Sequence, residues 1–326
     1  MKNNSIKSTD SKQIKDIKNI LSYEKKDKIL RLREEIKKNV IGQDHVLENL
    51  VSTLERGELE LNIDYSRPRP KGSFLFLGPT GVGKTEITLT FTNYLFGENC
   101  LHRIDMSEFM HFDSVKQFIG DETGSSGRLG NILENSTHGT LLFDEMEKAH
   151  SQIMDFFLQI LDAARITLGN GKTYDLSNYY IVFTSNIGAN RIPETGTVLS
   201  STLERGIQAE LRKNLRKEMI ARFGAVIIFK QLGSDIQNLI AKNLLDKEMK
   251  RMALRGCDLK YDESAFNYIV RNGINEGLGV RPLRDTIYRT VGDAICEILL
   301  RGDADPSGVL TLDKELHKLK ILKNNI

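Results

Sequence analysis

The sequence has few cysteines and no long hydrophobic run, and both shortages exclude classes of protein. Cys100, Cys257 and Cys296 are far apart and form no C-x-x-C pair, which argues against a zinc site or a disulfide framework and for a reducing, cytoplasmic setting. No apolar stretch approaches the length of a membrane span, and no hydrophobic leader follows Met1. We therefore expect a cytoplasmic protein without a membrane partner.

The sequence also has little net charge. Its 46 Lys and Arg residues nearly balance its 44 Asp and Glu residues, for a formal net charge of +2. No overall field therefore favours nucleic acid, although a Lys-rich N-terminal arm, residues 1–26, leaves local contacts with DNA open. A chain of 326 residues with 40% hydrophobic residues can build sizeable cores, so the protein is globular.

One glycine-rich motif, residues 78–85, carries the strongest chemical signal. It fits the phosphate-binding pattern G-x-x-x-x-G-K-[ST], with an apolar run before it and a helical pattern after it. Its glycines let backbone N–H groups point at phosphate oxygens, while Lys84 reaches the β- and γ-phosphates and Thr85 holds Mg²⁺. A structural glycine turn is the alternative. The predicted nucleotide-binding residues here are Gly78, Pro79, Thr80, Gly81, Val82, Gly83, Lys84, Thr85 and Glu86.

Two acidic residues follow a second apolar run. Residues 140–143 are typical of a buried strand and lead directly into Asp144 and Glu145. The carboxyl end of such a strand lies beside the phosphate loop in a parallel sheet, where Asp144 can hold Mg²⁺ and Glu145 can polarise the attacking water. A helix N-cap pair is the alternative, but it does not explain the apolar run.

A third apolar run, residues 179–183, ends in Thr184, Ser185 and Asn186. A polar group at the end of this strand can contact the γ-phosphate or its water. The alternation of strands and helices from about residue 70 to 230 predicts a parallel sheet covered on both faces. Other expected elements are a strand at 101–105, an exposed loop at 120–130, a hairpin turn at 169–171 and a helix around 156–161.

The remaining chain predicts an arm, two amphipathic helices and a second domain. Residues 1–26 are rich in Lys, Asn, Ser and Asp and favour a flexible arm. After about residue 230 the pattern changes to helices with short strands near 258–261, 309–312 and 319–322. The apolar positions of the two predicted helices are Ile29, Leu30, Leu32, Ile36 and Val40, and Val46, Leu47, Leu50, Val51 and Leu54.

In this order the motifs closely resemble those of the AAA+ ATPases, specifically the second ATPase domain of ClpB/ClpA-type unfoldases. The resemblance implies an α/β fold of the P-loop NTPase AAA+ type, with a doubly wound parallel sheet in residues 27–230 and a C-terminal, mainly helical small lid domain in residues 231–326. It extends from about residue 30 to the C-terminus. The matching stretches are residues 40–43, 72–85, 104–110, 142–150, 184–186 and 278–284.

The resemblance also implies roles for single residues. Asn186 is expected to be sensor 1, Arg281 to be sensor 2 from the lid, and Ile41 to line the adenine pocket of ATP. Arg222 lies where the family has an arginine finger that enters a neighbouring subunit, although the Pro and Asn of that motif are absent here. Such a finger has no use within its own subunit, so we expect a homohexameric ring. The predicted catalytic residues are Glu145, Asn186, Arg222 and Arg281, and the predicted Mg²⁺ ligands are Thr85 and Asp144.

The chain departs from its relatives in the regions that contact substrate. Relatives that thread proteins carry an aromatic G-Y-V-G loop, where this chain has Gly124-Ser125-Ser126-Gly127 and no Phe, Tyr or Trp between residues 121 and 139. Serine offers little apolar area to grip a peptide. The peptidase-docking tripeptide I-G-F or I-G-L is not found between residues 189 and 222. With no first ATPase domain ahead of residue 27, we expect a stand-alone motor core.

These features predict an ATPase that remodels or disassembles a protein or complex, with a protein as substrate or partner. Three alternatives stay open. In the first, ATP drives assembly of a switch or scaffold with little turnover. In the second, the protein threads its substrate with Tyr174 of the predicted hairpin, and in the third it acts on nucleic acid.

Overall fold

The computed structural model describes residues 22–61, 68–193, 200–275, 278–302 and 305–323. Helix α2 (Tyr23–Asn39) begins within the arm predicted for residues 1–26, and residues 1–21 of that arm lie outside the described ranges. The chain forms two compact units. The first comprises Met1–Gly78, Gly83–Ile192 and Leu199–Phe229, and the second comprises Pro79–Val82, Pro193–Val198 and Lys230–Ile326.

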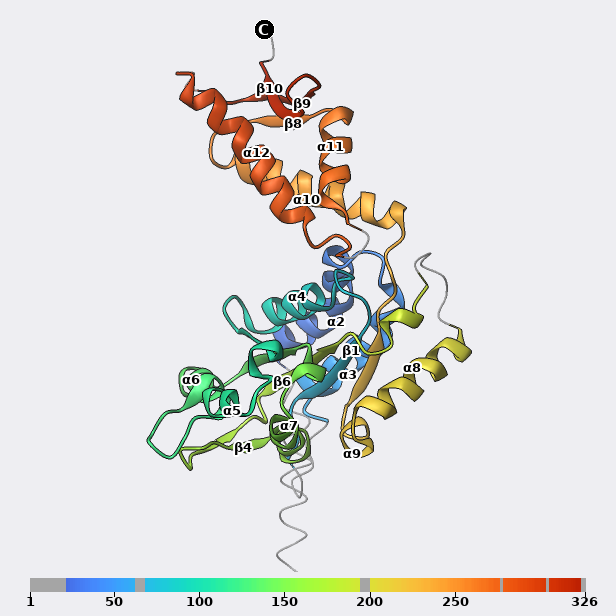
Figure 1. Ribbon diagram of the computed structural model, residues 1–326, viewed down its shortest axis with the longest axis vertical. Helices are drawn as coiled ribbons and strands as arrows, with labels where there is room; N and C mark the ends of the chain where they lie inside the picture. Colours follow the sequence, from blue (N-terminus) through green and yellow to red (C-terminus); the bar gives the residue numbers. More distant parts are fainter. Residues whose placement is uncertain (1–21, 62–67, 194–199, 276–277, 303–304, 324–326) are drawn as a thin grey trace, which may run out of the picture. The chain divides into compact units, whose positions relative to one another are not determined.

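A parallel sheet forms the centre of the first unit (Figure 1). Its strands are β1 (Gly72–Leu77), β2 (Leu101–Asp105), β3 (Gly139–Asp144), β6 (Tyr179–Ser185) and β7 (Ala225–Ile228). Among the described residues their spatial order is β2-β3-β6-β1-β7, and every neighbouring pair is parallel. All residues of β1, β3 and β6 are buried, as expected for apolar runs with helices on both sides. The predicted strands are therefore confirmed.

Aromatic side chains pack helices against one face of this sheet. Helix α2 contacts both α3 (Leu47–Glu58) and α4 (Lys84–Phe96), and α3 and α4 contact the strands. The Phe91 ring of α4 lies 6.1 Å from that of Phe74 and 5.9 Å from that of Tyr180, between centroids. The Tyr180 hydroxyl donates a hydrogen bond to the Leu54 carbonyl at 3.0 Å, which fixes α3 to the sheet.

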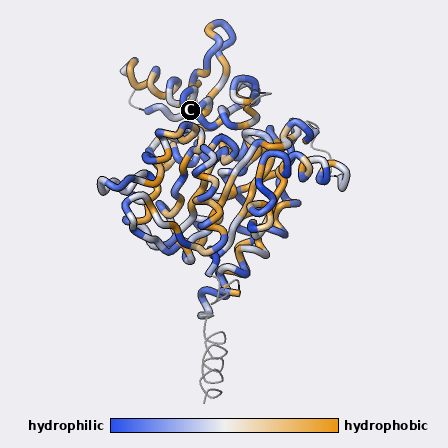
Figure 2. The backbone as a smooth tube through the Cα atoms, turned by 60° about the horizontal axis from the view of Figure 1, so that its bottom comes forward, coloured by the Kyte–Doolittle hydropathy of each residue, from blue (hydrophilic) through white to orange (hydrophobic). Residues whose placement is uncertain are grey.

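The opposite face packs on α7 (Ser151–Ala163). The Phe157 ring lies 4.7 Å from that of Phe143 and 4.8 Å from that of Phe183, and Figure 2 shows apolar residues, in orange, along the sheet. The predicted doubly wound α/β sheet is thus confirmed. The other elements of this unit are α5 (Phe112–Ile119), α6 (Gly127–Asn135), α8 (Ser201–Asn214), α9 (Lys217–Ile220), the short turns η2 (Met106–Phe109), η3 (Met146–Lys148) and η4 (Ala189–Arg191), and the hairpin β4 (Arg165–Thr167) and β5 (Thr173–Asp175).

Two details of the sequence prediction were wrong. In the glycine-rich segment 120–130 only residues 122–125 form an exposed loop, because Gly120 is buried and α6 begins at Gly127 and buries Leu129. Leu30 was assigned to the apolar face of α2, but it is 69% exposed, whereas Leu32 is fully buried. In both cases local composition suggested one environment and packing produced another.

The second unit contains three long helices and a small sheet within its described residues. Helices α10 (Ser234–Ala253), α11 (Glu263–Gly273) and α12 (Leu283–Leu300) share a core with the strands β8 (Leu259–Tyr261), β9 (Gly308–Asp313) and β10 (Lys318–Leu322). The strand order is β10-β9-β8, with β9 antiparallel to β10 and parallel to β8. The mainly helical C-terminal region with short strands is confirmed.

Candidate functional site

The predicted phosphate loop joins β1 to α4. Gly81 and Gly83 have φ angles of 78° and 102°, a left-handed region that other residues rarely adopt, so glycine suits both positions. Helix α4 begins at Lys84 with Gly83 as its N-cap. The N-terminus of a helix carries partial positive charge and free N–H groups, which together favour an anion such as phosphate.

Lys84 is buried at the start of α4, with 9% of its surface exposed. Its Nζ donates hydrogen bonds to a carbonyl of the loop and to Asn186 Oδ1, the latter at 3.0 Å. Burial lowers the pKa of Lys84 to about 8, against the opposing attraction of Asp144, Glu147 and Glu145. An ammonium group withdrawn from water in this way interacts strongly with any anion that reaches it.

The two predicted acids are held by neighbouring side chains. Asp144 Oδ1 accepts a hydrogen bond from Thr184 Oγ1, and its Oδ2 lies 2.5 Å from Nη2 of Arg103 on β2. Glu145 has a left-handed φ of 55°, its N–H donates to Thr184 Oγ1 at 3.0 Å, and its Oε2 lies 2.5 Å from Lys148 Nζ. The Thr184 hydroxyl therefore joins the two acids.

Asn186 follows the last residue of β6 and links the lysine to the second acid. Its Oδ1 accepts from Lys84 Nζ, while its Nδ2 lies 3.5 Å from Glu145 Oε1. Its backbone N–H donates to Glu147 Oε1 at 3.0 Å. The structure thus brings together four predicted residues, with Asp144 as the fourth, at the carboxyl ends of the neighbouring strands β1, β6 and β3.

Sequence reasoning missed four residues of this cluster, namely Arg103, Glu147, Lys148 and, as a partner of both acids, Thr184. Lys148 lies three residues after Glu145, a spacing at which opposite charges meet in a helical turn, so a local signal existed. Arg103 had none. It reaches Asp144 because β2 pairs with β3 in a register that sets Asp105 opposite Asp144, and pairing between strands is not visible in local sequence.

The two predicted arginines lie in different units. Arg222, in the first unit, forms an ion pair with Asp162 of α7, and its carbonyl accepts a hydrogen bond from Ser73 Oγ at 3.4 Å. Arg222 thus has a partner in its own chain, and its expected use in a neighbouring subunit stays a prediction. Arg281, in the second unit, is exposed and lies just before α12. Neither its role as sensor 2 nor the trans role of Arg222 is tested by these contacts.

Ile41 and Glu86 are two further residues that the sequence assigned to the nucleotide. Ile41 is half-buried between α2 and the turn η1 (Asp44–Val46). The ring of His45 in this turn lies with Nε2 2.9 Å from the Ile228 carbonyl at the end of β7, which fixes the segment to the sheet. Glu86 lies in the first turn of α4. Their assignment to the nucleotide stays a prediction, as does that of the phosphate-loop residues.

Glu134 of α6 links the serine-rich loop (residues 124–127) to the hairpin of β4 and β5. Its Oε1 accepts hydrogen bonds from Ser126 Oγ at 2.8 Å, Lys172 Nζ at 2.9 Å and the Tyr174 hydroxyl at 2.9 Å. These three hydrogen bonds lower the pKa of Glu134 to about 2, with the largest effect from Lys172, then Ser126 and then Tyr174. The turn predicted at 169–171 joins β4 to β5 as expected. Tyr174, the residue considered for peptide contact, is thus engaged within its own chain.

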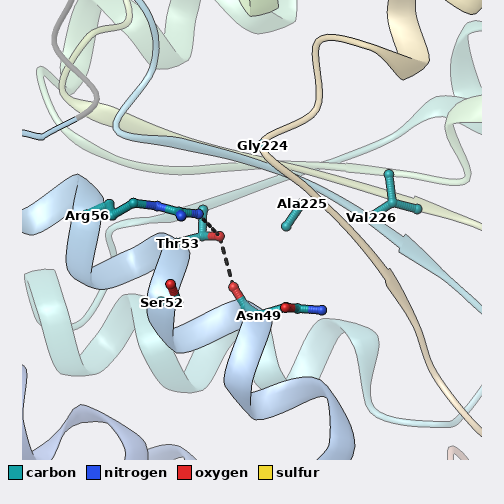
Figure 3. Close-up of a pocket in the computed structure, with 7 residues that line it drawn as sticks. All are labelled: Asn49, Ser52, Thr53, Arg56, Gly224, Ala225 and Val226. Carbon is teal, nitrogen blue, oxygen red and sulfur yellow. Dashed lines mark hydrogen bonds between the residues drawn. The ribbon is translucent and has the colours of Figure 1, made fainter.

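A polar pocket of ≈ 260 Å³ lies elsewhere in the first unit, between α3 and β7 (Figure 3). On its helix side, Thr53 Oγ1 donates to the Asn49 carbonyl at 2.8 Å and accepts from Arg56 Nη2 at 3.1 Å. None of the predicted site residues lines this pocket, whose lining residues are Asn49, Ser52, Thr53, Arg56, Gly224, Ala225 and Val226.

Comparison with known proteins finds two domain families along the chain. The profile of the AAA domain (Cdc48 subfamily) matches residues 69–226, and that of the C-terminal, D2-small domain of ClpB protein matches residues 232–312. The chain is 34% identical to the chaperone protein ClpB of Vibrio vulnificus, over 92% of this chain and 34% of that protein. It is 32% identical to a ClpA homolog, an ATP-binding subunit of the Clp protease, of Cyanidium caldarium, over 94% of this chain and 38% of that protein.

The chain is also similar in fold to a solved structure. The closed-state cryo-EM reconstruction of Hsp104 with ATPγS and FITC casein superimposes with a TM-score of 0.79 at 26% identity, covering 93% of this chain and 52% of that one. The chain spans about a third of the length of the curated relatives described above. Within the described ranges, no helix is long and apolar enough to cross a membrane.

Proposed function

Because the chain belongs to the Clp/ClpB family of AAA+ ATPases, we propose that it binds ATP with Mg²⁺ and hydrolyses the terminal phosphoanhydride bond. One observation carries this proposal, the unbroken series of contacts from Lys84 through Asn186 to Glu145. A cation, an amide and a carboxylate in this order can neutralise a phosphoryl group, orient a water molecule and accept its proton.

The nucleotide-binding residues fit this chemistry. The glycine loop and the N-terminus of α4 supply backbone N–H groups, and the buried Lys84 supplies a cation. Thr85 and Asp144 supply the hydroxyl and carboxylate oxygens that Mg²⁺ prefers. The ion, when bound, would neutralise charge on the β- and γ-phosphate oxygens.

The hydrolytic step is assigned to Glu145. Its Oε1 faces the Asn186 amide and its Oε2 faces Lys148, so the carboxylate is held in one orientation rather than free to rotate. A fixed carboxylate can orient the attacking water and accept its proton as the phosphoryl group leaves. Asn186 sits between this base and Lys84, where it can hold the same water or a phosphoryl oxygen.

The test of activity is steady-state ATP hydrolysis with Mg²⁺ by the wild type, Glu145→Gln and Lys84→Ala. Glu145→Gln should bind ATP but hydrolyse it on the order of a hundredfold more slowly, because the amide cannot accept the proton. Lys84→Ala should lose most ATP binding, measured with a fluorescent ATP analogue. Equal rates for the wild type and Glu145→Gln would show that Glu145 is not the base.

A second candidate function is an ATP-driven assembly switch with little turnover. It is favoured by one observation, namely that both acids are ion-paired, Asp144 with Arg103 and Glu145 with Lys148. If those pairs persist when ATP binds, the acids are not available for catalysis. The same assay separates the two functions, because a switch would bind ATP tightly and release almost no phosphate.

Assembly into a homohexameric ring is part of the proposal. Arg222 is 31% exposed at its side chain and pairs with a partly exposed Asp162, and an ion pair in that setting contributes only about 0–1 kcal/mol. The guanidinium can therefore exchange this partner for the γ-phosphate of a neighbouring subunit at little cost. Hydrolysis would then depend on subunit contact.

The proposed substrate is a folded protein or a protein complex that is remodelled rather than threaded. Hsp104 has been imaged with casein, which supports a protein substrate in this fold. In this chain, however, the serine-rich loop has no aromatic ring, and the Tyr174 ring is partly buried against the core while its hydroxyl is bound to Glu134, so neither offers a fully free aromatic face to a peptide. Threading by the hairpin is the alternative, and action on nucleic acid has only the Lys-rich arm in its favour.

A trapping experiment separates these substrates. The Glu145→Gln protein, loaded with ATP in the extract of its own cells, should retain one stoichiometric folded partner. Retention of many unrelated unfolded polypeptides would instead indicate threading. Nucleic acid retained at moderate salt would indicate that the protein acts on nucleic acid. Lys84→Ala, which should not hold ATP, is the matched control for adventitious binding.

A further inference from the structure

Glu147 has no assigned role in the proposed hydrolysis, although it lies beside the residues that carry it. It lies in the turn η3, directly after the acid pair. Glu145 has a left-handed conformation, which redirects the chain after β3, and the next residue, Met146, is fully buried and anchors the turn. The turn then contacts the end of β6. There Glu147 Oε1 accepts the backbone N–H of Asn186 at 3.0 Å.

Asn186 depends on this contact because it lies just beyond the sheet. The pairing of β6 with β1 ends at Ser185, which lies opposite Leu77. The Ser185 carbonyl still accepts the Gly78 N–H at 3.3 Å, but Asn186 has left the strand ladder. Its N–H is bound instead by a side chain, that of Glu147. The carboxylate thus replaces the strand partner that this backbone group would otherwise have.

The second oxygen of Glu147 makes no hydrogen bond to a described residue that would stabilise its burial. Within the described part of the chain, Oε2 is buried without a hydrogen-bond partner. A buried carboxyl oxygen left in this state costs free energy, and each such exception calls for an explanation, of which a functional role is one. Glu147 also lies close enough to Lys84 to attract its ammonium group. An apolar side chain would avoid the burial cost.

We propose that Glu147 is a positioning residue for ATP hydrolysis, which sets the place of Asn186 between Lys84 and Glu145 by holding its backbone N–H. This inference rests on the proposed ATPase function. The Asn186 side chain contacts Glu145 at the 3.5 Å limit of a hydrogen bond, so a small shift of its backbone breaks that contact. Displacements of about 1 Å at a reacting centre can cost on the order of a hundredfold in rate.

The test compares Glu147→Met, which removes the acceptor, with Glu147→Gln, which keeps an acceptor oxygen of the same reach. Glu147→Met should lower kcat about 10- to 100-fold with KM for ATP within about threefold of the wild type. Glu147→Gln should retain most of kcat. Because Glu147 acts through Asn186, adding Glu147→Met to Asn186→Ala should cause little further loss. The same Met substitution at the exposed Glu98 is the matched control.

A second measurement follows the contact itself and does not depend on turnover. Hydrogen exchange at the Asn186 amide should be faster in Glu147→Met than in the wild type or Glu147→Gln. Equal exchange in all three proteins, equal kcat for the wild type and Glu147→Met, or equal losses in the Met and Gln variants would each overturn the inference. A wild type that binds ATP without hydrolysing it would refute the proposed function itself, a result distinct from an active wild type with an equally active Met variant.

Discussion

Replacing Thr184 by Val removes the hydroxyl that joins the two acids and leaves a side chain of nearly the same shape. Thr184 is 1% exposed, donates to Asp144 Oδ1 and accepts from the Glu145 N–H at 3.0 Å. A hydrogen bond to a charged group contributes about 1.5–3 kcal/mol, and a buried N–H left without a partner costs about 1–3 kcal/mol. Asp144 keeps its contact with Arg103, so we expect Thr184→Val to lower the free energy of unfolding by about 2–4 kcal/mol.

Urea denaturation followed by circular dichroism measures this change, with Thr184→Ser as the matched control. Serine keeps the hydroxyl and loses one methyl group, which should cost only about 1 kcal/mol. The ATPase rate of the Val variant should also fall by about 10-fold or more, because the acids lose the hydroxyl that fixes their orientation. Stability of Thr184→Val equal to that of Thr184→Ser would refute the reasoning, since the two differ mainly in the hydroxyl.

The remaining predictions concern charged residues. The pKa of Lys84 is about 8, so ATP affinity, measured by fluorescence titration, should weaken by up to about tenfold per pH unit above pH 8; a flat profile would contradict this. Since that pKa lies below the unfolded value of 10.5, the contribution of Lys84 to stability increases as pH rises between the two values. Asp162→Asn should free Arg222 and so raise the ATPase rate at limiting protein concentration. The free energy of unfolding of this variant should change by less than about 1 kcal/mol. Arg222→Ala should instead lower both the ATPase rate and the oligomer size measured by light scattering. If neither variant changes rate or size, Arg222 is not the finger.

The core strands and the motifs at their ends could be predicted from sequence alone. Strands β1, β3 and β6 are buried at every residue. Each is therefore a largely apolar run that can be recognised from local sequence. The chemistry at their carboxyl ends follows directly, because Asp144 and Asn186 come at the ends of such runs. A glycine-rich loop between a strand and a helix is an equally local pattern, so Lys84 is recognisable from its neighbours in the chain.

Local signals failed where burial depended on distant neighbours. The Gly127 to Gly130 segment contains two glycines and was expected to be loop, yet it forms the start of α6 because Leu129 is buried in the core. Leu30 was grouped with the apolar face of α2 but faces solvent, because it follows Ile29 directly and so lies about 100° around the helix from it. Periodicity gives the spacing of one face of a helix, whereas the width of the face that is covered depends on what packs against it.

Only the tertiary structure decided which side chains the site residues contact. Arg103 reaches Asp144 because β2 lies next to β3, and Glu147 reaches Asn186 because the turn after β3 lies against the end of β6. The pairing of Arg222 with Asp162 joins residues that are far apart in the chain. Such contacts follow from strand order and helix packing, which are set by burial of the whole chain. The sequence by itself therefore determined the elements and their chemical groups, and the fold determined their partners, because hydrogen bonds and ion pairs act over a few ångströms of space and not of sequence.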